Sequence, residues 1–338
     1  MLQEVILKNT RLWIADPLVS YVEAFVEYVS LKKNHLFQVR ACTDQEQLKR
    51  MLDEEETEIL LITAKWYEAY REKLHGKCVI LLSEGSLPKR LAQDPSVYKY
   101  QSVENILREV MYYYSEQDGR ELCPAGIRRE NQVIGVYSPV DGLPKNIFAL
   151  TLGQILGEKK HVLYLNLEEC SGLKDLMGDH HWNMADLIYF LRQNKSNFLY
   201  RLNSMVQKCG SMDYIPACES YVDFRQITVK EWEKLLHLIR SQSAYDVIIL
   251  DMGISAGHAL EILRQCDGIY VPVRQDLISK GKVDQWERYV QILDGLDILE
   301  LAQKLELPLD RIGLTDKSEF FMLPERDLGN FIRDLLKS

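Results

Sequence analysis

The sequence lacks a long uncharged apolar run, since no stretch approaches the roughly 18 residues that a membrane-crossing helix requires. Its seven cysteines are odd in number and form no CxxC pair, which favours reduced thiols over a disulfide framework or a metal site. The N-terminal segment of the sequence has no basic stretch followed by an apolar run, so no signal peptide is expected. A positive excess is also absent, because the net charge is -9, and this argues against a nucleic-acid surface covering the whole protein. We therefore expect a cytoplasmic protein.

The length and composition are those of a globular protein with two domains. The chain has 338 residues, of which 46% are hydrophobic and 27% charged, so it can bury substantial cores. A polar stretch with Gly and Pro over residues 116–130 interrupts the apolar periodicity and is the best linker candidate. The predicted domains are accordingly residues 1–115 and 131–338.

The first part alternates short apolar runs with helical patterns. The predicted strands cover 11–16, 36–42, 58–64, 77–83 and 97–100, and the predicted helices cover 18–32, 44–54, 65–73 and 102–114. Strands that alternate with helices indicate a parallel sheet covered on both faces, which places this domain in the α/β class.

Five such units resemble the receiver domain of two-component signalling, in which acids at strand ends hold Mg²⁺ and an Asp accepts phosphate. Here Asp16 is one remaining acid, Thr63 stands where the phosphoacceptor Asp is expected, and Ser83 matches the usual Ser or Thr. Lys99 lies near the fifth strand, although the residues that follow it do not fit the pattern of the family's lysine. The resemblance implies an unphosphorylatable pseudo-receiver used for docking. A generic flavodoxin-like domain without signalling ancestry remains the alternative.

The second part begins with a stretch, GVYSPVDGLPKNI at 135–147, that has the outline of a phosphate-binding loop. An apolar strand precedes it and a helical pattern follows it. Such loops bind phosphate because backbone N–H groups and a helix N-terminus converge on the phosphate oxygens, while a Lys adds charge. Three further buried strands are predicted within 161–169, 244–253 and 266–276, two of which end in acids.

This succession of strands resembles the ParA/MinD family of deviant Walker ATPases, which have a P-loop NTPase fold. Together with the receiver-like part, it more specifically resembles the TadZ/CpaE proteins of tight-adherence (type IVc) pilus systems. The nucleotide-binding residues that the resemblance implies are Gly142, Leu143, Lys145, Asn146, Ile147, Glu168, Asp251 and Gly253.

Several positions depart from the family's motifs. Val140 replaces the Lys that reaches across a dimer, and Asp141 replaces a Gly with a charge that repels phosphate. Pro144 removes a backbone N–H, and Asn146 replaces the hydroxyl that binds Mg²⁺. Asn166 stands where the family has its water-positioning Asp. We assign no catalytic or metal-binding residue and expect weak nucleotide binding or none, with ATP or ADP and Mg²⁺ as the cofactors that the family leaves open.

The resemblance implies a non-catalytic localisation and assembly hub for a Tad pilus or a related secretion system. Its expected partners are a second copy, through the ATPase-like domain, and other proteins of the machinery, at the cell pole or the inner face of the membrane. One alternative is a slow ATP-binding switch; another is a DNA-associated partition protein, which the acidic charge disfavours. The final segment has the apolar face of an amphipathic helix, but its mixed charges favour packing against the sheet over membrane binding.

Overall fold

The computed structural model divides the chain into two compact units. It describes residues 10–31, 37–53, 58–74, 77–85, 87–91, 93–116, 131–140, 143–178, 182–193, 198–253, 258–308 and 317–337. The first unit consists of the described residues within Met1–Ile127 and Lys195–Ser204, and the second of those within Arg128–Asn194 and Met205–Ser338.

The first unit is built on a five-stranded parallel sheet. Its strands are β1 (Thr10–Ala15), β2 (Phe37–Cys42), β3 (Ile59–Thr63), β4 (Cys78–Ser83) and β5 (Ser96–Tyr98), in the order β2-β1-β3-β4-β5. Every pairing is parallel, and this order is that of flavodoxin-like folds. The predicted α/β class and the five predicted strands of this part are confirmed.

Helices cover both faces of this sheet. They are α1 (Val19–Leu31), α2 (Gln45–Asp53), α3 (Ala64–Tyr70) and α4 (Val103–Glu116), with short 3-10 turns at η1 (Arg71–Lys73) and η2 (Lys89–Leu91). Successive side chains of a strand point to opposite faces, so Leu12 packs in the cluster beneath α1 and α4, while Trp13 packs with α2 and α3. Both faces are therefore apolar, which explains the nearly continuous hydrophobic runs of these strands.

A segment from the second half of the chain also belongs to the first unit. Helix α8 (Phe198–Met205) contributes Tyr200 to the core beneath α1 and α4. The Tyr200 hydroxyl hydrogen-bonds to that of Thr10, and its ring meets Tyr114 edge to face, with centroids 5.0 Å apart. The predicted assignment of all of 131–338 to one domain is therefore wrong for residues 198–204, because the Tyr200 side chain completes the core of the first unit.

The second unit contains a seven-stranded sheet. Its strands are β6 (Gln132–Val136), β7 (Val162–Leu167), β8 (Gln207–Cys209), β9 (Met212–Ile215), β10 (Val247–Met252), β11 (Gly268–Val273) and β12 (Ala302–Glu306). Their order is β12-β11-β6-β10-β7-β9-β8, and all pairs are parallel except β8 with β9. The predicted fold class, two doubly wound α/β domains with mainly parallel sheets, is confirmed.

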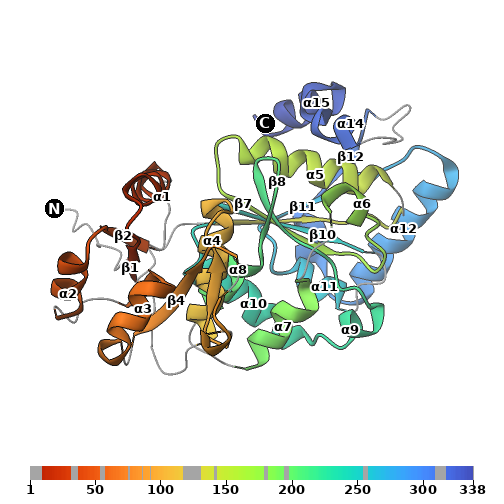
Figure 1. Cartoon of the computed structure of the whole chain (residues 1–338). Helices are drawn as coiled ribbons and strands as arrows, with labels where there is room; N and C mark the ends of the chain where they lie inside the picture. The colour runs from red at the N-terminus through yellow and green to blue at the C-terminus, as the bar shows by residue number, and fades with distance from the viewer. Residues whose placement is uncertain are drawn as a thin grey trace, which may run out of the picture. The chain divides into compact units, whose positions relative to one another are not determined.

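Helices lie on both faces of this second sheet as well (Figure 1). The longer helices are α5 (Leu143–Gly157), α7 (Met184–Arg192), α10 (Val229–Gln242), α12 (Leu277–Ile292) and α15 (Asp327–Leu335). The shorter ones are α6 (Lys174–Met177), α9 (Tyr221–Arg225), α11 (Ala259–Leu263), α13 (Leu296–Leu301), α14 (Lys317–Phe321) and the 3-10 turn η3 (Leu323–Glu325). Helix α5 and the C-terminal α14 and α15 lie on one face, and α7, α9, α10 and α11 on the other.

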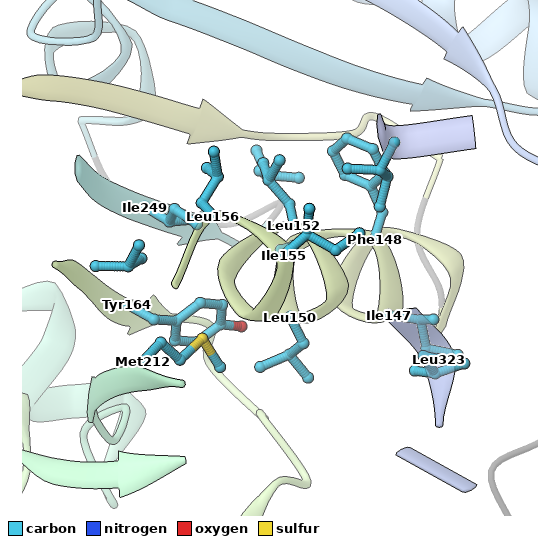
Figure 2. Packing of buried hydrophobic residues seen from close by; sticks show 14 of the residues in the cluster. Ile147, Phe148, Leu150, Leu152, Ile155, Leu156, Tyr164, Met212, Ile249 and Leu323 are labelled. Carbon is cyan, nitrogen blue, oxygen red and sulfur yellow. The ribbon is translucent and has the colours of Figure 1, made fainter. Parts of the chain in front are cut away.

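Helix α5 is apolar on nearly all sides because it is enclosed. Its side chains pack against Tyr164 and Ile249 of the sheet and against Leu323 of η3 (Figure 2). Beyond it lies α15, whose Leu328 and Ile332 are buried in the same cluster. The C-terminal helix thus packs onto α5, as an inward-facing amphipathic helix. Among the described residues, no helix is long and apolar enough to cross a membrane.

The protein is expected to lose stability at acidic pH through Glu231, at the N-terminus of α10. Glu231 closes a capping box with Thr228 and pairs with Arg192 at 2.6 Å, and its bond to Arg192 lowers the pKa of Glu231 to about 2. A lowered pKa in the folded state stabilises the fold above the ordinary value of about 4.3, and this stabilisation is lost as the pH falls toward 2. We expect Glu231→Gln to cost about 1 kcal/mol at pH 7 and little at pH 2 in urea unfolding. An equal cost at both pH values would contradict this.

Candidate functional site

The candidate site lies where three neighbouring parallel strands end. Strand β10 runs between β6 and β7, and Asp251 of β10 is in register with Val136 of β6 and Asn166 of β7. The carboxyl ends of β6, β7 and β10 therefore meet at one edge of the sheet, the position at which open α/β sheets bind ligands. Helix α5 starts a few residues after β6, so its N-terminus lies at this edge.

The central residue of the site is Lys145, in the first turn of α5. It is only 3% exposed. Its Nζ lies 2.9 Å from Oε1 of Glu168 and also donates a hydrogen bond to Oδ1 of Asp251. The hydroxyl of Tyr164 donates to the other oxygen of Asp251. The charge of Lys145 is thus already neutralised by two carboxylates of the chain itself.

Two amides hold Glu168 in place. Asn146, the residue after Lys145, donates its side-chain N–H to Oε2 of Glu168. Asn166, which is fully buried, accepts a hydrogen bond from the Glu168 backbone N–H at 2.9 Å. Asn146 and Asn166 therefore have a structural role, because both position the carboxylate that pairs with Lys145.

Burial and charge act together on the pKa values of this cluster. Burial raises the pKa of Glu168, and the nearby Asp251 raises it further, although Lys145 opposes both effects. Burial alone would lower the pKa of Lys145, but the attraction of Asp251 and Glu168 raises it. Burial and Asp251 also raise the pKa of Tyr164 well above its ordinary value. Lys145 therefore remains charged at neutral pH and stays bound to its two acids.

A third acid covers the end of β10. A Cβ atom placed on Gly253 would lie 2.1 Å from Oε2 of Glu169, so the Glu169 carboxylate lies directly over this glycine. The Gly253 backbone N–H donates to the Leu167 carbonyl at 3.2 Å. The carboxylates of Glu168 and Glu169 thus lie against the lysine and the glycine that a bound phosphate would need. In this arrangement the residues do not fit a nucleoside triphosphate with Mg²⁺.

The other predicted nucleotide-binding residues have different surroundings. Ile147 is 1% exposed and lies in the apolar cluster near Leu323 (Figure 2). Leu143 is the first residue of α5, and its side chain lies outside the described atoms. Gly142 and Asp141 lie outside the described residues. The backbone N–H of Val140 donates a hydrogen bond to the Ser138 hydroxyl at 3.1 Å.

The first unit has a buried ion pair at the corresponding edge of its sheet. Asp16, directly after β1, is fully buried, and its Oδ2 lies 2.7 Å from Nζ of Lys99, which follows β5 and is 2% exposed. Nζ of Lys99 also lies 3.0 Å from Oε1 of Glu84, and this hydrogen bond lowers the pKa of Glu84. The ends of β1 and β5 thus bring Lys99 into contact with Asp16, the acid predicted for this site. The sequence alone left open whether Lys99 matches the lysine of receiver domains.

Thr63 and Ser83 end the neighbouring strands β3 and β4. Thr63 precedes α3 but makes no side-chain capping bond to that helix. The Ser83 hydroxyl donates to the Gly85 carbonyl at 3.1 Å and accepts from the Gly85 N–H at 3.2 Å, so it stabilises the turn after β4. In the part of the chain that the structure describes, no group of three or more His, Cys, Asp or Glu side chains could hold a metal ion.

No protein-family model and no curated protein matches the sequence. Among solved structures, the chain is similar to a ParA family ATPase from Chlorobium tepidum TLS, with 22% identity and a TM-score of 0.45 over 58% of this chain and 81% of that one. It is similar to a plasmid partition protein from Borrelia burgdorferi (16% identity, TM-score 0.45, 62% and 99% covered). It is also similar to the cell division protein MinD of Aquifex aeolicus (17%, 0.40, 61% and 79%).

Proposed function

We propose that the chain is a non-catalytic docking and assembly hub of the TadZ/CpaE type, which acts in the cytoplasm as a homodimer within a Tad pilus or related secretion system. The observation that supports this is the ion cluster of Lys145, Glu168 and Asp251. A lysine that is buried and paired with two acids offers no free charge to a phosphate. Phosphoryl transfer depends on such charges to stabilise its transition state.

The first unit supports the same proposal as a pseudo-receiver. Thr63 ends β3, where the resemblance places the phosphoacceptor Asp, and a hydroxyl cannot form an aspartyl phosphate. Asp16 is already neutralised by Lys99, and both are buried. This unit then contributes a surface for binding other proteins of the machinery and takes no part in phosphate chemistry.

Isothermal titration tests whether the cluster excludes nucleotide. We expect ATP with Mg²⁺ to give no binding heat up to about 1 mM, a concentration at which a binder with only about 4 kcal/mol would be half saturated. The oligomeric state in sedimentation should also be the same with and without ATP. Tight binding of ATP, or turnover of ATP by the purified chain, would contradict the proposal.

A slow ATP-binding switch is the second candidate, and one observation favours it. The acids that neutralise Lys145 come from the ends of β7 and β10, where metal-binding acids lie in P-loop proteins. If they moved away from Lys145, the same three groups would be free to bind a nucleotide and a cation. Glu168→Gln separates the candidates, because it weakens the hold on Lys145. The switch predicts tighter ATP binding by this variant, whereas the docking hub predicts no binding by either protein.

A further inference from the structure

Glu169 carries a carboxylate for which the described part of the chain offers no ion-pair partner. It follows β7 as the second residue after Leu167, and its Oε1 is buried without a hydrogen bond. This distinguishes it from Glu168 and Asp251, which both pair with Lys145. A buried carboxylate oxygen that accepts no hydrogen bond is unfavourable, so its presence indicates a group that binds here and supplies the donor.

The carboxylate of Glu169 lies over the end of the neighbouring strand. Strand β10 runs between β7 and β6, and Gly253 follows β10 directly. A Cβ atom on Gly253 would lie 2.1 Å from Oε2 and 2.9 Å from Oε1 of Glu169. The side chain thus starts after β7 and places its carboxylate in the space that the glycine leaves. The end of β6, which Tyr137 follows, is on the other side of β10.

Aromatic side chains from the end of β6 and from α12 surround this position. Tyr137 is 6% exposed and Trp286 of α12 is 7% exposed, with their ring centroids 5.5 Å apart. Tyr289 comes three residues after Trp286, so it lies on the next turn of the same side of the helix. Burial, together with the proximity of Tyr289 and Glu169, raises the pKa of Tyr137 to about 12. Such electrostatic effects weaken with distance, which places these side chains in one group.

The hydroxyl of Tyr137 is a second unused polar group. More than nine-tenths of this side chain is buried, yet its hydroxyl makes no hydrogen bond within the residues that the structure describes. Buried tyrosine hydroxyls usually have a partner. With its raised pKa the hydroxyl is neutral at pH 7, and its oxygen can accept a hydrogen bond. The ring of Tyr289, which is 55% exposed, is the part of the group that reaches solvent.

An acid beside aromatic rings is the chemistry that binds an organic cation, because the faces of the rings attract positive charge. A guanidinium fits best. Its planar group stacks on a ring while its N–H groups bind a carboxylate, and it is less strongly hydrated than an ammonium. A hard metal ion would need several oxygen ligands. Among the described residues, no group of three or more His, Cys, Asp or Glu side chains could supply them.

We propose that Glu169, Tyr137, Trp286 and Tyr289 form a binding site for a guanidinium group, with the carboxylate as its ion-pair partner and the aromatic rings beside it. The site shares no member with the ion cluster of Lys145, so the inference goes beyond the proposed function and does not rest on it. For a docking hub, an arginine side chain of another protein is one source of this cation. A free small molecule is the other source.

Ethylguanidinium is the probe for the first test, by saturation-transfer NMR on the full-length chain at constant ionic strength. We expect a dissociation constant of about 1 mM, and binding at least tenfold weaker for ethylurea, which has a similar shape and no charge. Glu169→Gln keeps the shape of the side chain and should also weaken ethylguanidinium at least tenfold. Glu219→Gln, at an exposed glutamate elsewhere, is the matched control. Absence of binding at about 20 mM, or binding that Glu169→Gln leaves unchanged, would overturn the inference.

Gly253→Ala tests the position of the carboxylate. The new Cβ takes the place of the Glu169 carboxylate, and this flexible side chain can move aside, so we expect weaker binding with a nearly native unfolding temperature. In the Glu169→Gln background the same change should weaken binding no further, because the charge is already gone. Gly268→Ala, at a glycine with open space around it, is the control. Native affinity in Gly253→Ala would contradict the assigned position.

Two forms of arginine distinguish the sources of the cation. L-Argininamide is a free cation, whereas a short alanine peptide with one central arginine and blocked ends presents the same group on a backbone. Tighter binding of the peptide assigns the site to an arginine of another protein, and tighter binding of argininamide assigns it to a small molecule. Either result supports a guanidinium site, and failure of both to displace ethylguanidinium overturns it. ATP binding by the native chain would contradict the proposed function and leave this result unchanged.

Discussion

Replacement of Lys145 with methionine is expected to destabilise the second unit by about 3–5 kcal/mol, the cost of leaving a buried charge without its partner. Methionine fills nearly the same space as lysine, so packing changes little. Glu168 and Asp251 would then face each other without a cation, at a site where Lys145 is 3% exposed. Urea unfolding followed by circular dichroism measures this change.

Two comparisons make the result specific to the ion cluster. Lys159→Met changes an exposed lysine just after α5, and we expect it to shift stability by less than about 0.5 kcal/mol. The triple variant Lys145→Met, Glu168→Gln, Asp251→Asn removes every charge and should recover much of the loss, because the neutral amides can remain hydrogen-bonded. A Lys145→Met protein as stable as the native one would show that the lysine is not held by its acids.

The second large effect is expected at Gly329, where alanine should cost about 3 kcal/mol or more. Gly329 lies in α15, and a Cβ atom there would lie 1.9 Å from the carbonyl oxygen of Pro324 in η3. This oxygen also accepts a hydrogen bond from Arg333. The clash is with backbone atoms, so a change of rotamer cannot relieve it and α15 must move away from η3.

The control for this effect is a glycine with open space around it. Gly268, the first residue of β11, would place its Cβ at more than 4 Å from any atom outside its immediate neighbours. Thermal unfolding of both variants measures the difference, and we expect Gly268→Ala to be near neutral. If the Gly329→Ala variant unfolds at the same midpoint temperature as the native protein, the close packing of α15 on η3 is not required for the fold.

The strands of the first unit were predictable because their chemistry is local. A run such as ILLIT at 59–63 is buried on both faces, and its length and flanking residues identify a strand without any tertiary information. The place of α8 was not predictable in this way. Its helical pattern shows that it buries one face, but the pattern does not reveal that Tyr200 completes a core built from residues about 90 to 190 positions earlier.

The residues of the candidate site could be predicted from the sequence, but the ion pairs between them could not. Motif positions identified Lys145, Glu168 and Asp251, and the structure brings all three together. The sequence did not reveal that they pair with one another, since a motif gives positions along the chain and not distances between side chains. Glu169 was missed, although its place directly after Glu168 at the end of β7 was the available signal. Lys99 was left undecided because the residues after it differ from the family's pattern.

Residues 198–204 have a consequence at the level of the gene. The first unit draws on two separate stretches of the sequence, so no single cut of the coding sequence yields both units complete. A fragment that stops before the second unit loses Tyr200, and with it the edge-to-face partner of Tyr114 and the hydroxyl that bonds Thr10. The reciprocal fragment, starting after the linker, carries α8 as an apolar helix without the core that buries it. Recombination that exchanges the front part alone would therefore separate the first unit from the helix that completes its core.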